Sequence, residues 1–445
     1  MSEPVRARSN LVDRSKKARH IEQIAVVGAG RVGCPTAVVF ASYHPTIEFK
    51  VLDNNPHVHN NWRAGGAVFQ EPGLMDLIYS LENIEFLSAT QPETYTADMV
   101  MICVPLPGSC SDVCYRLKPL LARVKTGSIV VIRSTMQVGS LDEVKRRMHL
   151  PEDDIDHIPC RASTILTNPE FLSAGNSVRD LQKPDRVIIG CDASEDRAAQ
   201  TATLERLYRQ WIPQKKIYCT SYKTAEMVKL GANVMRAQRI IGMNTLHALA
   251  ENLKIDATEV RDLIGMDHRL QGHNQNLRTG VDGPCLPGDI QTVASLAESF
   301  HLPDVKRYWN NMVKTNAWNQ KSLIVNTVSV LKVKLTAGSK VAVAGFAFKP
   351  HTDEFRRSRT VAAFSPRLIA HLIVAGFEVN VYDPLCTITD VHNEVIRCCD
   401  KRHKDLMNGG SFAVYNTNLR QACEGVRAIL LTHGSAVGRY ATADE

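Results

Sequence analysis

The chain has 445 residues, of which 44% are hydrophobic and 22% are charged, as in water-soluble globular proteins. That length predicts two or three domains. The net charge of +7 lies partly in a basic segment over residues 1–20, expected to be disordered, so nucleic-acid binding is not indicated. No apolar run is long enough for a membrane span or a secretory signal. We therefore expect a cytoplasmic protein whose 12 cysteines are reduced and which has no metal site.

The first predicted element is a strand over Ile24–Val27, followed at once by Gly28-Ala29-Gly30-Arg31-Val32-Gly33 and a helix through Ala41. Strand, glycine pattern and helix in series predict a dinucleotide site, because glycines let a pyrophosphate approach the backbone. A second strand, Phe49–Leu52, leads to Asp53, whose carboxylate would bind ribose hydroxyls and repel a 2′-phosphate. NAD is therefore favoured over NADP. A glycine-rich turn without a cofactor is the alternative.

Further buried parallel strands are predicted over Met99–Val104, Ser128–Ile132 and Ser163–Leu166. The second of them ends in Arg133-Ser134-Thr135, which places hydroxyl groups at the carboxyl edge of the sheet, where open α/β folds bind ligands. The third brings Glu170 to the same edge. Glu170 is a candidate acid, base or substrate ligand, although a loop carboxylate is more often only solvated.

The apolar period changes to 3.6 between about Tyr222 and Asn252, which predicts one long helix. Lys229 and Asn233 lie on one face of it. A helix of this length between two α/β regions is typical of an axis between domains and of a dimerisation surface. More helix is expected over Ala257–Ile264 and from Pro303 to about Leu331.

A second α/β region is predicted from the strand Val341–Ala344 onward, and a later strand, Glu378–Tyr382, ends in Asp383 as the earlier one ends in Asp53. Between these two strands lies a basic cluster of the kind that binds a diphosphate. A solvated charge run is the alternative interpretation. The cluster consists of Lys349, Arg356, Arg357 and Arg359.

Residues 280–289 hold three glycines, two prolines and Cys285, with Asp289 four places later. This composition predicts a strained, backbone-exposing loop. A thiol on such a loop is a candidate covalent nucleophile, because a thiolate attacks carbonyl carbon. A buried, inert thiol in a turn is the alternative.

Together these residues resemble the UDP-glucose 6-dehydrogenase family of nucleotide-sugar dehydrogenases. The resemblance covers the chain from Ile21 to about Thr432, and its further motifs are QEPGL, NPEFLSAG, KPDRVIIG, IGMDHR, GFAFK and VYDP. It implies an α/β fold of two Rossmann-like doubly wound domains joined by a long central helix. The expected segments are a tail (1–20), an NAD-binding domain (21–220), a central helical dimerisation domain (221–334) and a UDP-sugar-binding domain (335–445).

The resemblance also implies the reaction, a four-electron oxidation of UDP-glucose to UDP-glucuronate with two NAD. It further implies that the chain forms a homodimer or higher homo-oligomer. Cys285 would form a thiohemiacetal and then a thioester, Lys229 and Asn233 would stabilise the oxyanion, and Asp289, Thr135 and Glu170 would serve hydrolysis. The implied cofactor-binding residues are Gly28, Gly30, Arg31, Val32, Gly33, Asp53, Val104, Ser134 and Thr135. The implied substrate-binding residues are Glu170, Phe171, Leu172, Lys229, Asn233, Arg269, Gly283, Phe348, Lys349 and Arg356.

Departures from the family pattern leave alternatives open. The family usually reads FGGSCFPKD at the thiol, whereas this chain has Asp282, Pro284 and Gly288 around Cys285. The family also continues past the point where this chain stops, at Glu445, so we expect a C-terminally short member. The alternatives are a catalytically impaired paralogue that binds nucleotide or a homologous subunit, and a dehydrogenase of GDP-mannose or a UDP-N-acetylhexosamine.

Overall fold

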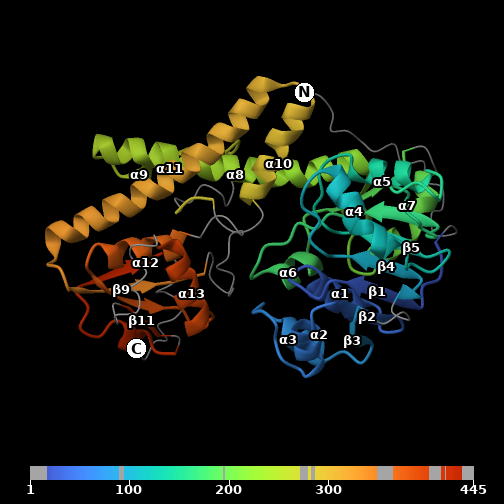
Figure 1. Cartoon of the computed structure of the whole chain (residues 1–445), viewed down its shortest axis with the longest axis horizontal. Helices are drawn as coiled ribbons and strands as arrows, with labels where there is room; N and C mark the ends of the chain where they lie inside the picture. The colour runs from blue at the N-terminus through green and yellow to red at the C-terminus, as the bar shows by residue number, and fades with distance from the viewer. Residues whose placement is uncertain are drawn as a thin grey trace. The chain divides into compact units, whose positions relative to one another are not determined.

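The structure, a computed structural model, describes residues 18–89, 95–193, 196–270, 279–281, 286–347, 364–399, 412–415 and 417–432. The chain forms two compact units, unit 1 (Met1–Lys229) and unit 2 (Leu230–Glu445). Each unit contains a sheet, mostly parallel in unit 1 and parallel in unit 2, with helices packed on it (Figure 1). Within the described ranges, no helix is long and apolar enough to cross a membrane.

The sheet of unit 1 has eight strands in the order β3-β2-β1-β4-β5-β6-β7-β8. All neighbours pair parallel except β6 and β7, which pair antiparallel. The order of the first six strands is that of a dinucleotide-binding fold. The strands are β1 (Gln23–Val27), β2 (Glu48–Asp53), β3 (Ile84–Ser88), β4 (Met99–Ile102), β5 (Ile129–Ile132), β6 (Thr164–Thr167), β7 (Val187–Cys191) and β8 (Ile217–Ser221).

Helices cover both faces of this sheet, because successive strand residues point to opposite sides. In β1, Ile24 and Val26 pack in one core with α1, α6 and α7, whereas Ala25 and Val27 pack in another with α4 and α5. The predicted doubly wound arrangement is thus confirmed for unit 1. The helices are α1 (Gly33–Tyr43), α2 (Pro56–Arg63), α3 (Leu74–Tyr79), α4 (Cys110–Leu121), α5 (Ser140–Met148), α6 (Ser177–Gln182), α7 (Arg197–Tyr208) and a short 3-10 helix (Gln214–Lys216).

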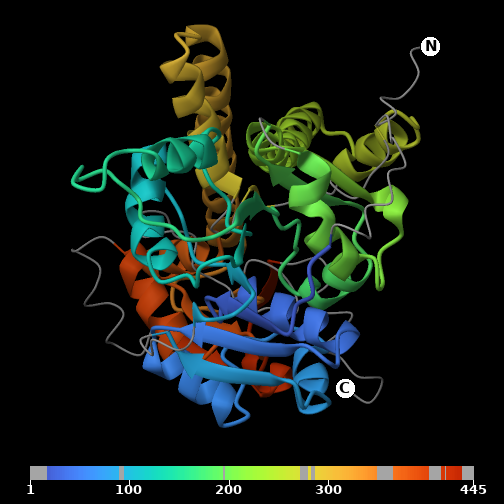
Figure 2. The ribbon, with the colours of Figure 1, turned by 90° about the vertical axis from the view of Figure 1, so that its right-hand side faces the viewer.

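The long helix α8 (Tyr222–Leu253) begins in unit 1 and continues into unit 2, which confirms the helix predicted from Tyr222 to about Asn252. In unit 2, α10 and α11 follow one another through a short connection and lie side by side (gold in Figure 2). The helices of this part are α9 (Ala257–Gly265), α10 (Leu286–Ser299) and α11 (Pro303–Lys334).

The sheet of unit 2 has four parallel strands in the order β11-β10-β9-β12, which repeats the order β3-β2-β1-β4 of unit 1. Its core consists of alternate residues of β9 and β10 packed under α11, α12 and α13. The predicted second Rossmann-like domain is thus confirmed. The elements are β9 (Lys340–Ala344), α12 (Phe364–Val374), β10 (Glu378–Tyr382), α13 (Ile388–Cys398), β11 (Phe412–Tyr415), α15 (Leu419–Ala422) and β12 (Ala428–Leu431).

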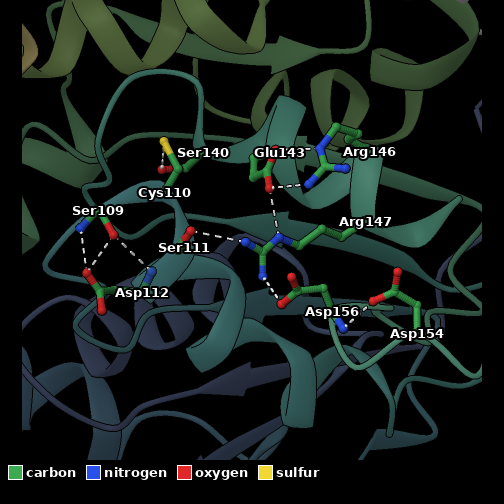
Figure 3. A network of polar contacts seen from close by, with 10 residues as sticks. All are labelled: Ser109, Cys110, Ser111, Asp112, Ser140, Glu143, Arg146, Arg147, Asp154 and Asp156. Atoms are coloured by element: carbon green, nitrogen blue, oxygen red, sulfur yellow. Dashed lines mark hydrogen bonds and ion pairs between the residues drawn. The ribbon is translucent and has the colours of Figure 1, made fainter. Parts of the chain in front are cut away.

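A charged network fastens α5 to its neighbours in unit 1 (Figure 3). The carboxylate of Glu143 accepts hydrogen bonds from Arg146 at 2.7 and 2.8 Å and from Arg147 at 2.8 Å. Arg147 donates further to Asp156 at 2.8 Å and to Ser111 at 3.0 Å. The hydrogen bonds from Arg146 and Arg147, opposed by burial, lower the pKa of Glu143 to about 2.

We predict that Glu143→Gln lowers the free energy of unfolding by about 1–2 kcal/mol near neutral pH, because a neutral amide cannot hold two guanidinium groups. The lowered pKa means that the stabilisation is present above the ordinary value of 4.5 and is lost as the pH falls towards 2. Denaturant unfolding at several pH values measures it. The exposed Glu152, changed to Gln, is the control; an equal loss in both variants would contradict the prediction.

Candidate active site

The glycine-rich loop after β1 is packed too closely for side chains at its two ends. Gly28 has a φ of +101°, and a Cβ there would lie 2.9 Å from the carbonyl oxygen of Cys103. A Cβ on Gly33 would lie 1.8 Å from the carbonyl oxygen of Gly28. The loop therefore presses against the end of β4 and against the start of α1, as the glycine pattern predicts.

The side chain of Asp53, at the end of β2, bonds to the backbone of this loop. One carboxylate oxygen accepts the N–H of Ala29 at 2.9 Å, and the other accepts the N–H of Asn55 at 2.9 Å. The N-cap residue of α1, Val32, provides no side-chain cap. A helix N-terminus without such a cap beside glycines is a site for an anionic group.

The ends of β4 and β5 complete the same sheet edge. The hydroxyl of Ser134 donates to the carbonyl oxygen of Val104 at 2.5 Å, and a Cβ on Gly28 would lie 3.2 Å from the Val104 side chain. Thr135 follows and is half-buried. The guanidinium of Arg31 lies 5.0 Å from the centre of the Phe69 ring. The structure thus brings Gly28, Val104 and Ser134 together at the edge.

A buried ion pair joins the segment after β6 to α8. The ammonium group of Lys229 donates to a carboxylate oxygen of Glu170 at 2.7 Å and to its carbonyl oxygen at 2.6 Å. The side chains of Lys229 and Glu170 are only 6% and 12% exposed. The other carboxylate oxygen accepts the N–H of Leu172 at 2.6 Å, and the ring of Phe171 lies 5.5 Å from the Lys229 nitrogen. Four predicted site residues therefore form one cluster in unit 1.

In unit 2, Asn233 donates its amide N–H to the carboxylate of Asp289 at 2.6 Å, and Asp289 is buried. The backbone before the predicted nucleophile loop is held at Val281, whose N–H and carbonyl both bond to the amide of Asn316 at 2.7 and 3.1 Å. Leu286 begins α10, so residues 286–289 are helical and the prediction of a loop over 280–289 is wrong for its second part, because Pro287 lies in the first helical turn, where proline is tolerated. The two described ends of the loop are thus fixed by helices α11 and α10.

Arg269 is exposed and pairs with the neighbouring Asp267, at 2.6 Å between a guanidinium nitrogen and a carboxylate oxygen. Five further predicted residues lie outside the described part of the chain. They are Gly283, Cys285, Phe348, Lys349 and Arg356.

A buried polar cluster at this sheet edge was not predicted as part of the site. Arg133, at the end of β5, is 2% exposed and donates hydrogen bonds to Asn168 and to Tyr208, the latter at 2.7 Å. Tyr208 donates to the same Asn168 oxygen at 2.5 Å. An arginine directly after a buried strand was the only sequence signal, since Tyr208 lies far along the chain on α7.

Glu71, in the QEPGL motif, is another buried polar residue that was not predicted as part of the site. Its buried carboxylate accepts the N–H groups of Gly175 at 3.0 Å and Ser177 at 2.7 Å, at the start of α6. The contact fastens QEPGL to NPEFLSAG, the motif that contains Glu170. The sequence shows both motifs but gives no sign that one caps the other.

Comparison with known proteins identifies the family. Residues 22–212 match the model of the NAD binding domain of the UDP-glucose/GDP-mannose dehydrogenase family, and residues 223–318 match the central domain of the same family. The cofactor is therefore NAD, as predicted from the sequence.

Relatives and solved structures agree with these matches. The chain is 31% identical over 378 residues to UDP-glucose 6-dehydrogenase of Pongo abelii, covering 82% of this chain and 74% of that one. It is 32% identical over 387 residues to UDP-glucose 6-dehydrogenase 1 of Oryza sativa subsp. japonica, covering 84% and 78%. Its fold matches a UDP-glucose dehydrogenase from Pyrobaculum islandicum, with a TM-score of 0.70, 23% identity and coverage of 93% and 90%. The chain belongs to the UDP-glucose/GDP-mannose dehydrogenase family.

Proposed function

We propose that this NAD-dependent nucleotide-sugar dehydrogenase oxidises UDP-glucose to UDP-glucuronate through a covalent intermediate on Cys285. The observation that carries the proposal is the set of polar contacts along one face of α8, where Lys229 bonds to Glu170 and Asn233 bonds to Asp289. An ammonium group and an amide one turn apart suit a reaction that develops negative charge on an oxygen. The names of relatives about 30% identical support UDP-glucose as the sugar nucleotide.

The nucleophile is assigned to Cys285 partly by contrast with the described cysteines. Burial raises the pKa of Cys103 and of Cys398 to about 12, and that of Cys114 to about 11. Such thiols stay protonated near neutral pH and attack carbonyl carbon poorly. In the sequence, Cys285 instead comes directly before Leu286, the first residue of α10. A helix N-terminus favours a thiolate.

The proposed reaction consists of two oxidations and one hydrolysis. Two NAD molecules, held in turn at the β1–α1 loop, would supply a hydride acceptor for each oxidation. The first oxidation gives the C6 aldehyde, and its hydroxyl proton is released to water. The Cys285 thiolate adds to the C6 aldehyde, Lys229 and Asn233 stabilise the resulting oxyanion, and loss of hydride from this thiohemiacetal leaves a thioester. Water then cleaves the thioester to release the carboxylate and the thiol. Asp289 and Thr135 position that water, and Glu170 assists its deprotonation.

Substrate binding is proposed for residues of both units. In unit 1, Phe171 and Leu172 flank Glu170, and in unit 2 Arg269 is exposed. Gly283, Phe348, Lys349 and Arg356 complete the proposed set, in which the cations bind the diphosphate.

A homo-oligomer is proposed on the surface of α8 and α9. Several large apolar side chains are exposed there, among them Leu249 at 60%, Leu253 at 69% and Leu263 at 58%. Exposed apolar side chains gathered on neighbouring elements are typical of protein interfaces. A second copy of this chain is the proposed partner.

Open space at the β1–α1 loop supports NAD binding there. A Cβ added to Gly30 would meet nothing within 4 Å, in contrast to Gly28 and Gly33. Open space at the middle glycine, beside the N-terminus of α1, fits a pyrophosphate. The carboxylate of Asp53 has acceptor capacity beyond its two N–H bonds, which fits ribose hydroxyls.

The glycines provide a test of NAD binding. We predict that Gly30→Ala leaves the melting temperature of the free protein unchanged but removes its rise on adding NAD, because only the ligand occupies that space. Gly33→Ala should instead lower the melting temperature with and without NAD, since its Cβ overlaps the Gly28 carbonyl. Gly242→Ala, in α8 with nothing within 4 Å of its Cβ, is the control for glycine replacement as such. A full NAD response in Gly30→Ala would contradict the prediction.

The catalytic proposal is tested with NAD and a panel of UDP-glucose, GDP-mannose and UDP-N-acetylhexosamines. NADH should form with UDP-glucose, and Cys285→Ser should reduce its rate by more than about 10³-fold, because a hydroxyl without an activating base is a poor nucleophile. Cys160→Ser is the matched control. NADH formation with another sugar alone would reassign the substrate. No NADH from folded protein that binds a sugar nucleotide would contradict the enzymatic proposal and favour a non-catalytic paralogue.

A further inference from the structure

The first turns of α8 carry three side chains on one stripe that all bond to the sheet of unit 1 or its loops. Tyr222, Glu226 and Lys229 are spaced by four and three residues, which places them on one helix face. The hydroxyl of Tyr222 donates to the carbonyl oxygen of Ile165 in β6 at 2.6 Å. Lys229 bonds to Glu170, just beyond the end of β6. Glu226, between them, belongs to none of the roles assigned above.

Glu226 caps the helix that follows β5. One of its carboxylate oxygens accepts the N–H of Gly139 at 2.7 Å, and the other accepts the N–H of Leu141 at 3.1 Å. Gly139 is the N-cap residue of α5, has a φ of 93° and provides no side-chain cap of its own. The N-terminal N–H groups of α5 are thus satisfied by a carboxylate from a different helix. Glu226 is 3% exposed, so water does not compete for these bonds.

The capped residues end the loop that contains Thr135. The loop leaves β5 after Ile132, passes the buried Met136 and reaches Gly139 four residues after Thr135. Near its start, Ser134 donates to the carbonyl oxygen of Val104 at 2.5 Å, and near its end the thiol of Cys110 contacts the carbonyl oxygen of Val138 at 3.8 Å. The bonds of Ser134 and Cys110 lead to β4 and α4, whereas the two bonds that Glu226 accepts join the end of this loop to α8.

We infer that Glu226 is a positioning residue, which holds the Thr135 loop against α8 and so fixes the place of Thr135 relative to Lys229. Glu226 and Lys229 are one turn apart on α8, so the helix joins the two contacts rigidly. The catalytic consequence rests on the proposed function, in which Thr135 positions water and Lys229 stabilises the oxyanion. The mechanical part, a loop fastened by one buried carboxylate, rests only on unit 1.

The charge of Glu226 matters because only the carboxylate accepts both N–H groups fully. Burial, opposed by the two N–H bonds, raises the pKa of Glu226 to about 7. Asp142 on α5 raises that pKa further and Lys223 on α8 lowers it, while Cys110 on α4 also faces the group. Asp142 and Lys223 pair with each other at 3.0 Å. As the pH rises through about 7, Glu226 ionises and the loop is held more firmly.

Glu226→Gln tests the inference, because an amide offers one acceptor and turns an N–H group against the second donor. Hydrogen–deuterium exchange of the peptides over residues 135–141 is expected to accelerate by about tenfold or more, whether or not the protein turns over substrate. NADH formation should show kcat reduced by about 10–100-fold with KM for UDP-glucose changed little, because misplacement affects the transition state. The ratio of the wild-type kcat to the Glu226→Gln kcat should increase as the pH is raised from about 6 to about 8.

Asp142→Asn is the matched control, since it removes a charge at the same helix end but leaves both N–H bonds to Glu226. It should reproduce wild-type exchange and kcat at about pH 8, where Glu226 is ionised with or without the Asp142 charge. Unchanged exchange over residues 135–141 in Glu226→Gln would overturn the mechanical inference. Faster exchange with unchanged kcat would overturn the catalytic role. Absence of activity in the wild-type protein would count against the proposed function alone, because the exchange measurement does not depend on it.

Discussion

The buried ion pair of Lys229 and Glu170 fixes α8 against the carboxyl edge of the unit 1 sheet, and the other contacts at that edge depend on it. With side chains 6% and 12% exposed, neither charge is well hydrated, and removing one partner of such a pair costs about 3–5 kcal/mol. The pair therefore fixes the turn of α8 that contains Lys229 against the segment after β6. Two other side chains on the same face of α8 then bond to unit 1: Tyr222 to β6, and Glu226 to the N-terminus of α5.

In both units, an aspartate at the end of the second strand accepts backbone N–H groups of the turn that follows the first strand. In unit 1, Asp53 at the end of β2 accepts the N–H of Ala29. In unit 2, Asp383 after β10 accepts the N–H groups of Phe346 and Ala347 at 2.8 and 3.0 Å. Each aspartate follows the second strand of its own parallel sheet, so the carboxylate lies at the same edge as the first turn. In both units the aspartate holds the backbone of the turn without using a side chain of the turn itself.

The sequence predicted the parts whose signals are local. The strand, glycine pattern and helix from Ile24 to Ala41, the second strand that leads to Asp53 and the long helix from Tyr222 all have short-range patterns, and these elements are confirmed. The contacts of Arg133 with Tyr208 and of Glu71 with Ser177 were not predictable, because each joins residues far apart in sequence with ordinary local patterns. Glu226 has the same difficulty: a glutamate in an amphipathic helix normally faces water.

The central claim is a four-electron oxidation through a covalent intermediate, and the number of NADH molecules formed per UDP-sugar consumed tests it most directly. Limiting UDP-glucose is incubated with excess NAD, and NADH, uronate and free aldehyde are each quantified at completion. We expect two NADH per UDP-glucuronate and no free aldehyde, because the thiohemiacetal holds the intermediate until the second oxidation. One NADH per sugar with release of the aldehyde would contradict the claim.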